Sequence, residues 1–259
     1  MSKICSKFAG GIKDTTMELF IELSAALLPA IALMVYIYWK DPVKEPAKEL
    51  IRAAVLGATL CVPVALVEHF VQTALFGPNP ESVSLLGTTV QAFFVAAIPE
   101  EAAKLFILWL VVRKNKYFDE HIDGIVYAVY VSLGFAAIEN VFYVIGSENW
   151  LSVAVTRSLL AVPGHYAFAV LMGYYYSLYH FVSPTRKNAA MVLLMPVLAH
   201  GIYDALAMSG EANPVVGTIA FGVLIYFCIR MHRFAAGHIV ALIHKDQNQP
   251  KETPTDYIA

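Results

Sequence analysis

Charged residues are scarce in this sequence. Asp, Glu, Lys and Arg make up 15% of the 259 residues, whereas soluble domains contain about 25%. Hydrophobic residues make up 58%, and they gather into runs of roughly 18 or more, the length that spans a bilayer as a helix. These runs leave no room for a soluble domain, and the composition predicts a polytopic integral membrane protein.

Other common signatures are also missing. The three cysteines, Cys5, Cys61 and Cys228, form no pair at metal-ligand spacing, so we interpret them as small apolar residues of packed helices. No basic stripe interleaved with aromatic residues is present, which excludes nucleic acid as a partner. The HExxH motif of soluble zinc peptidases does not occur either.

The apolar runs predict an all-α bundle of about seven transmembrane helices, of which the third and fifth are kinked or broken. Pro99-Glu100-Glu101 interrupts the third helix, and Pro163-Gly164 interrupts the fifth. The predicted spans are residues 21–39, 50–76, 85–112, 125–145, 151–181, 189–208 and 215–231.

Positive charge alternates between the predicted loops. The first, third and fifth loops and the segment after the last span contain Lys and Arg, whereas residues 77–83, 146–150 and 209–214 contain neither. The positive-inside rule therefore places the C-terminus in the cytoplasm and, with seven spans, the N-terminus outside. We divide the chain into an N-terminal segment (1–20), a transmembrane domain (21–232), and an interfacial helix with a polar cytoplasmic tail (233–259).

Several ionisable side chains lie within the predicted spans, where each costs at least about 2.5–3.5 kcal/mol. Such residues persist when they pair, line a cavity or take part in chemistry. Counting a rise of about 1.5 Å per residue from the cytoplasmic ends places Glu101 and His200 at a depth of roughly 17 Å. The same count places Glu139, His165 and Asp204 at roughly 20–25 Å. Four helices thus present acid or imidazole groups at compatible depths, which predicts one shared polar site.

Spacing also relates these residues on the same helix. His200 and Asp204 are four residues apart and share a helix face, so they could bind a metal together, or the aspartate could orient the histidine. Glu100 and Lys104 are spaced for an ion pair, and we expect one glutamate of the pair Glu100-Glu101 to be held by Lys104 while the other faces the site.

The residue types favour metal-assisted hydrolysis. Mixed imidazole and carboxylate ligands suit zinc, and a glutamate beside the metal's water can serve as general base. Another divalent ion remains possible for a site rich in glutamate. Every residue also has a structural interpretation, in which ion pairs and hydrogen bonds only hold helices together.

Arg157 is either an outer-interface residue or the partner of a site carboxylate, and we assign Glu68-His69 to the membrane interface.

Several of these segments resemble one known family. Ile98-Pro99-Glu100-Glu101-Ala102-Ala103-Lys104 resembles the EExxK motif of the PrsW family of bacterial intramembrane proteases, and Gly134-Phe135-Ala136-Ala137-Ile138-Glu139-Asn140 is similar to its FxxxE segment. Arg157, Pro163-Gly164-His165, and His200 with Asp204 follow in the family's order. The resemblance covers roughly residues 25 to 232. The family is in turn similar to the type II CAAX prenyl proteases and to the Aph subunit of gamma-secretase, which is a scaffold.

The resemblance implies a metal-dependent peptidase, integral to the bacterial cytoplasmic membrane, that cleaves a membrane protein or peptide in or near the lipid bilayer. For PrsW itself it implies the first cleavage of a membrane-anchored anti-sigma factor. Carried over by position, Glu100 and Glu101 are the catalytic pair, and Glu139, His165 and His200 are the candidate metal ligands or water-positioning groups. Asp204, which shares a helix face with His200, joins them as a candidate ligand, and zinc is the expected ion. Glu139 stands where the CAAX enzymes have histidine.

Two other classes of function stay open at this point. A scaffold like the Aph subunit would use the same polar residues only to hold helices together. A proton-coupled transporter would use them as a proton relay, although no repeated halves are evident in the sequence. The oligomeric state cannot be predicted from these features.

Overall fold

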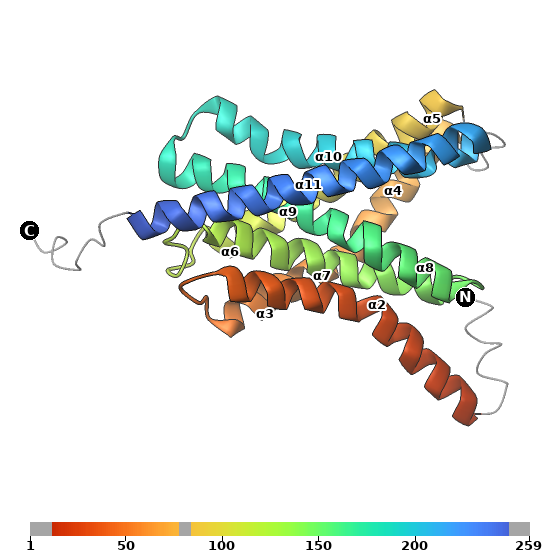
Figure 1. Cartoon of the computed structure of the whole chain (residues 1–259), viewed down its shortest axis with the longest axis horizontal. Helices are drawn as coiled ribbons and strands as arrows, with labels where there is room; N and C mark the ends of the chain where they lie inside the picture. The colour runs from red at the N-terminus through yellow and green to blue at the C-terminus, as the bar shows by residue number, and fades with distance from the viewer. Residues whose placement is uncertain (1–11, 78–83, 249–259) are drawn as a thin grey trace, which may run out of the picture.

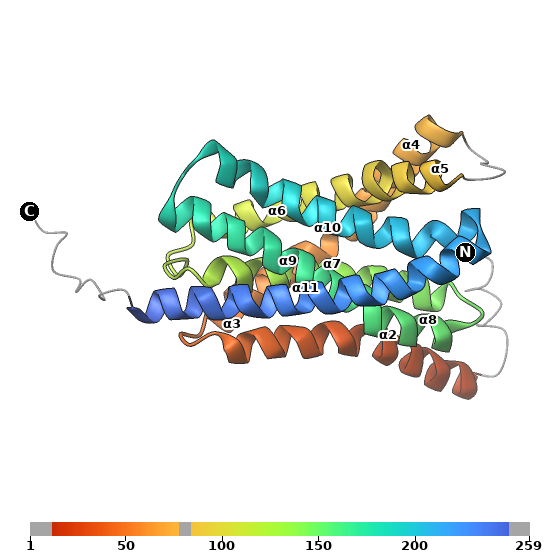
Figure 2. The same cartoon turned by 45° about the horizontal axis from the view of Figure 1, so that its top comes forward.

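The computed structural model describes residues 12–77 and 84–248, which form helices and contain no strand. The helices run roughly parallel along the long axis of the molecule (Figures 1 and 2). Three π-helical segments, labelled η, are continuous with α-helices. In chain order the elements are α2 (Ile12–Lys40), α3 (Ala47–Thr59), α4 (Cys61–Phe76), α5 (Leu85–Val90), η1 (Gln91–Ala97), α6 (Ile98–Val112), α7 (Asp123–Ile145), α8 (Trp150–Thr156), η2 (Arg157–Ala161), α9 (Val162–Ser177), η3 (Leu178–Val182), α10 (Arg186–Ala212) and α11 (Pro214–Asn248).

Within the described residues, six helical stretches are long and apolar enough to cross a membrane. They are Thr16–Lys40, Ala47–Phe76, Asp123–Ile145, Trp150–Val182, Arg186–Gly210 and Pro214–Asn248. These stretches correspond to the first, second and fourth to seventh predicted spans. The third predicted span is the continuous helix α5–η1–α6, which carries Glu100, Glu101 and Lys104 and is not among the six. The prediction of an all-α polytopic membrane protein is confirmed.

The predicted breaks in the third and fifth spans take the form of π-helical turns. The segment η1 ends just before Pro99, and η2 ends just before Pro163, so each proline stands in the first turn of the α-helix that follows. A proline lacks the backbone N–H that would continue the hydrogen-bond ladder, and the π turn before each proline accommodates this gap. Single π turns are common at functional sites. The chain therefore stays helical through both positions.

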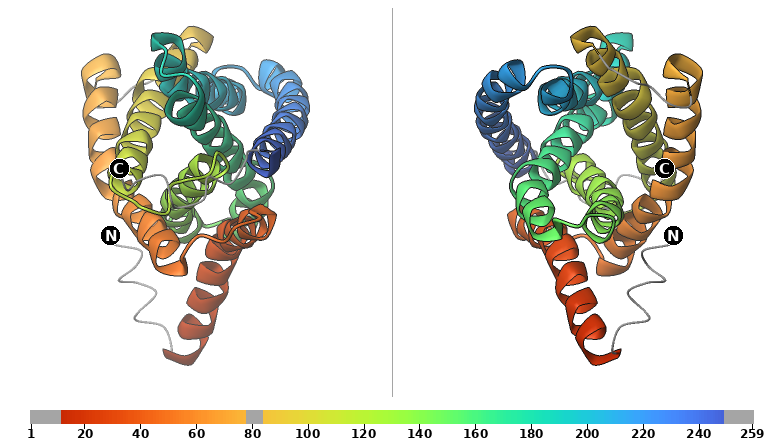
Figure 3. Two further views of the ribbon diagram at one scale, coloured as in Figure 1. Left: turned by 90° about the vertical axis from the view of Figure 1, so that its left-hand side faces the viewer. Right: turned by 90° about the vertical axis from the view of Figure 1, so that its right-hand side faces the viewer.

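Helix α7 forms the centre of the bundle, packed against α2, α3 and α9 (Figure 3). Its contact with α3 is made by small residues. A Cβ atom added to Gly57 of α3 would lie 2.0 Å from the carbonyl oxygen of Val131, and one added to Gly134 of α7 would lie 2.0 Å from that of Ala54. Glycine lets the two backbones approach closely, as is usual between membrane helices.

The first and last helices extend beyond the predicted spans. The first half of α2 leans away from the bundle, and Pro29 lies inside this helix (Figure 1). Helix α11 continues without interruption to Asn248, so residues 233–248 prolong the seventh span. Most of the predicted N-terminal segment (1–11 of 1–20), residues 78–83 of the second loop and the end of the tail (249–259) lie outside the described residues, and the domain boundaries at 20 and 232 stay predictions.

Candidate active site

The first part of the site comes from α6. Glu100 and Glu101 stand in its first turn, and Lys104 follows one turn later. The Lys104 ammonium donates hydrogen bonds to Glu100 Oε2 and Glu101 Oε1, both at 2.8 Å. All three side chains are buried. Lys104 therefore holds both glutamates, whereas the sequence led us to expect that it would hold only one.

Two histidines reach this charged group from neighbouring helices. His200 of α10 places Nδ1 3.0 Å from Glu101 Oε1 and Nε2 3.2 Å from Asp204 Oδ2. His165 of α9 places Nδ1 3.2 Å from the Lys104 ammonium. Both rings are buried, and their centroids are 5.4 Å apart. The spacing of His200 and Asp204 thus gives the shared helix face that was predicted.

Helix α7 and segment η2 contribute the outer part of the site. Glu139 Oε2 lies 3.0 Å from His165 Nε2 and accepts a hydrogen bond of 2.6 Å from the Arg157 guanidinium. The same guanidinium donates to Asn140 Oδ1 at 2.6 Å and lies 4.0 Å from the centre of the Tyr143 ring. Of the two interpretations open for Arg157, the structure therefore shows the partner of a site carboxylate.

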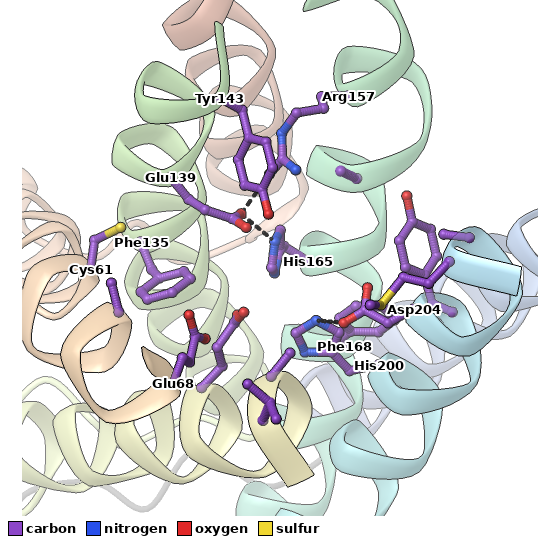
Figure 4. Close-up of a pocket in the computed structure, with 18 of the residues that line it drawn as sticks. Cys61, Glu68, Phe135, Glu139, Tyr143, Arg157, His165, Phe168, His200 and Asp204 are labelled. Atoms are coloured by element: carbon purple, nitrogen blue, oxygen red, sulfur yellow. Dashed lines mark hydrogen bonds and ion pairs between the residues drawn. The ribbon is translucent and has the colours of Figure 1, made fainter. Parts of the chain in front are cut away.

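These side chains surround a cavity of about 680 Å³. Figure 4 shows Glu68, Glu139, His165 and His200 pointing toward a common space from four helices. Glu100 and Asp204 also line the cavity. Glu101 is fully buried and is not among the lining residues; it contacts Lys104 and His200 instead.

The structure brings three possible metal ligands together. Glu100, His165 and His200 each offer one ligand atom, and these atoms lie within 4.8 Å of one another. Two imidazoles and one carboxylate are a ligand set of catalytic zinc sites. Of the predicted ligands, Glu139 and Asp204 instead contact His165 and His200, which is the position of carboxylates that orient metal-binding histidines.

The hydrogen-bonding pattern of His200 fits a bound cation. Both of its nitrogens face carboxylate oxygens, and a neutral imidazole can donate to only one of them. In addition, the second oxygen of the fully buried Glu101, Oε2, has no hydrogen-bond partner among the described residues. The acceptors around His200 therefore favour additional positive charge, which either a protonated ring or a bound metal ion can supply.

One acidic residue of the cavity was placed wrongly by sequence reasoning. Glu68 lines the cavity from α4, although we had assigned it to the membrane interface. The signal was in the sequence, because Cys61, Ala65 and Glu68 follow one another at helical spacing and all three line the cavity. These residues therefore mark the face of α4 that meets the cavity.

Comparison with known proteins gives a consistent assignment. The profile of the PrsW family, described as intramembrane metalloproteases, matches residues 45–231. The chain is 38% identical to Protease PrsW of Oceanobacillus iheyensis, over 70% of this chain and 80% of that protein. It is 34% identical to Protease PrsW of Bacillus subtilis, over 81% of this chain and 92% of that protein.

A third relative, Protease PrsW of Clostridioides difficile, is 32% identical over 80% of this chain and 88% of that protein. No solved structure matches the chain. The matched residues include every side chain of the cavity described above. The buried glutamates, histidines and arginine thus lie within the part of the chain that matches the family profile, and this chain is a member of the PrsW family of intramembrane metalloproteases.

Proposed function

We propose that this protease is a zinc-dependent endopeptidase of the bacterial cytoplasmic membrane, with its C-terminus in the cytoplasm. The observation that supports zinc is the convergence of Glu100, His165 and His200 within 4.8 Å beside a cavity among the helices. When bound there, zinc would lower the pKa of a water molecule and polarise a peptide carbonyl. The other residues of the cavity have roles that follow from their contacts.

Glu101 and Lys104 position the ligand groups in this proposal. Lys104 holds Glu100, and Glu101 accepts from Lys104 and contacts Nδ1 of His200. Asp204 and Glu139 orient the two imidazoles. Compared with the prediction of a catalytic pair, Glu100 becomes a metal ligand and Glu101 a positioning residue that does not face the cavity.

Glu68 is the proposed general base. It faces the cavity and forms no hydrogen bond or ion pair with the other described residues, whereas Glu139 is held by Arg157. A carboxylate free of a cation is the better proton acceptor, and it can pass the proton to the leaving amine. Arg157 lines the same cavity and can donate a hydrogen bond to the oxygen on which negative charge develops.

The proposed substrate is a membrane-anchored protein, and the family resemblance suggests an anti-sigma factor. Glu68, His165 and His200 belong to helices long and apolar enough to cross the membrane, so the peptide bond must reach them from within or beside the bilayer. A substrate helix satisfies its own backbone hydrogen bonds, so it must unwind locally before its carbonyl can be attacked.

Metal content and cleavage test the proposal together. The purified variants Glu100→Gln, His165→Ala and His200→Ala are compared with the wild type by metal analysis and by cleavage of a membrane-anchored fluorogenic peptide in vesicles. We expect equimolar zinc in the wild type, and loss of both zinc and cleavage in the three variants. Glu49→Gln is the matched control, because Glu49 forms a surface ion pair with Arg52 away from the cavity.

Glu68→Gln separates the base from the ligands. We expect it to keep zinc and to lower kcat by about 10²–10⁴-fold, the usual contribution of a general base. If Glu100→Gln instead kept its full zinc content, Glu100 would not be a metal ligand and would again be a candidate for the general base. Full cleavage by His165→Ala and His200→Ala would overturn the proposed site.

Neither alternative class of function has a comparable observation in its favour. A scaffold needs no open cavity beside its polar residues, and the family to which the chain belongs consists of proteases. A transporter would share the buried acids but not the convergence of two imidazoles and one carboxylate on one point.

A further inference from the structure

A second group of acidic side chains lies at the end of the molecule that we expect to face the cytoplasm. Asp41 and Glu45 belong to the connection between α2 and α3, and Asp119 and Glu120 to the connection between α6 and α7. Asp123 begins α7. Figure 1 shows both connections at the same end of the bundle. We call these five residues the cytoplasmic acidic cluster.

The carboxylates of this cluster are close enough to share an ion. Ligand atoms of Asp41, Glu120 and Asp123 lie within 4.8 Å of one another, and so do those of Glu45, Asp119 and Asp123. Asp123 is common to both groups and therefore stands between them. No histidine or cysteine belongs to either group.

Two of the carboxylates are buried, and each accepts hydrogen bonds through only one of its two oxygens. Asp41 and Asp123 are both 0% exposed. Asp41 Oδ1 accepts from the Val43 amide, and Asp123 Oδ2 accepts from the amides of Asp119 and Glu120. The other oxygens, Asp41 Oδ2 and Asp123 Oδ1, are buried and have no hydrogen-bond partner among the described residues. Buried polar atoms normally have partners, so two unsatisfied carboxyl oxygens in one acidic group point to a missing ligand.

The nearest lysine does not bond to these oxygens. The Lys44 ammonium binds the carbonyl oxygens of Tyr38, Trp39 and Asp41 at the end of α2. Burial raises the pKa of Asp41 to about 6 and that of Glu45 to about 7, so ionising either carboxyl near neutral pH costs free energy that a nearby cation would offset.

We propose that the cytoplasmic acidic cluster binds a hard divalent cation, Mg²⁺ or Ca²⁺, at a site separate from the catalytic metal. Carboxylate oxygens are the ligands that both ions prefer, in contrast to the two imidazoles of the membrane cavity. The ion would link the α2–α3 and α6–α7 connections. The α6–α7 connection joins the helices that carry Glu100 and Glu139, so the site would fix the cytoplasmic ends of two helices of the active site.

The test uses the full chain in detergent micelles after treatment with a chelator. The melting temperature (Tm) is measured against MgCl₂ and CaCl₂ at constant ionic strength, and binding of each ion is measured by calorimetry. We expect a saturable rise in Tm, because a ligand that binds only the folded state stabilises it. The ion that binds more tightly identifies the preference of the site.

Three variants locate the effect. Asp41→Asn with Asp123→Asn should weaken cation binding at least about tenfold, because two anionic ligands are lost. The variant Glu100→Gln should keep the Mg²⁺ or Ca²⁺ response, which separates this site from the catalytic one. Asp119→Asn changes an exposed side chain and should fold normally while binding the cation more weakly.

Two results would overturn the proposal. One is a wild-type protein with no saturable response to either ion, which would mean that protons alone neutralise the cluster. The other is an unchanged response in both Asp119→Asn and the double variant, which would place the bound ion elsewhere.

Discussion

At the scale of single residues, Lys104 is the centre of the site. Its ammonium lies 2.8 Å from an oxygen of each neighbouring glutamate and 3.2 Å from Nδ1 of His165, and its side chain is 1% exposed. Two buried carboxylates therefore depend on one buried cation. Removing one partner of such a group leaves an uncompensated charge away from water.

The substitution Lys104→Met keeps the length of the side chain and removes the charge. We expect it to lower the free energy of unfolding by about 3–5 kcal/mol, the usual cost of breaking a buried ion pair. Thermal unfolding in detergent measures the change, and Lys114→Met, in the exposed α6–α7 connection, is the control. Neutralising Glu100 and Glu101 with glutamine in the same chain should restore part of the loss. Equal stability of Lys104→Met and the control would contradict this view of the group.

Sequence reasoning was successful where the helix itself fixes the distance between residues. The four-residue spacings placed Glu100 beside Lys104 and His200 beside Asp204, and both contacts are present. Contacts between helices depend on rotation and tilt, which one sequence does not encode locally. For that reason the meeting of Lys104 with His165 could not be predicted.

At the scale of helices, the position of Glu139 depends on how α7 packs. Gly134 lies just over one turn before Glu139, where the backbone of α3 touches α7. Any side chain at this position must push the two helices apart or strain them. Apolar periodicity predicted both helices, but it could not show that glycine was needed at their contact.

Gly134→Ala should therefore destabilise the bundle and also reduce cleavage. Overpacking typically costs about 1–3 kcal/mol, and a displaced α7 would move Glu139 away from His165. Gly222→Ala in α11 is the matched control, because a Cβ atom there meets nothing within 4 Å. Thermal unfolding and the peptide cleavage assay are measured on both variants, and a fall in Tm confined to Gly134→Ala is expected. Indistinguishable variants would argue against tight packing between α3 and α7.

At the scale of the whole molecule, length shows which parts reach beyond the bilayer. Helix α11 has 35 residues, about 52 Å at 1.5 Å per residue, whereas the hydrocarbon core is about 30 Å thick. Near its end, Asp246 accepts hydrogen bonds from the backbone amides of His121 and Ile122. The last turns of α11 therefore bind the α6–α7 connection, on the side where the cationic loops lie.

The orientation of the chain can be tested with single cysteines in intact bacteria. After replacement of the native cysteines by alanine, Lys114→Cys should be protected from a membrane-impermeant thiol reagent, and Ser147→Cys should be labelled. The positive-inside rule gives this result, because Lys114 belongs to a cationic loop and Ser147 to a loop without Lys or Arg. Permeabilised cells, in which both positions should react, are the control. The opposite pattern in intact cells would invert the topology.

The lysine held between two glutamates also bears on how the protein is made. A site composed only of acids and imidazoles would have to protonate its acids or bind its metal before it could settle in lipid, because uncompensated buried charges are costly. Here the chain supplies its own counterion from the same helix. Insertion into the membrane and binding of the metal can therefore be separate events. The metal-free protein can fold first and bind its ion afterwards.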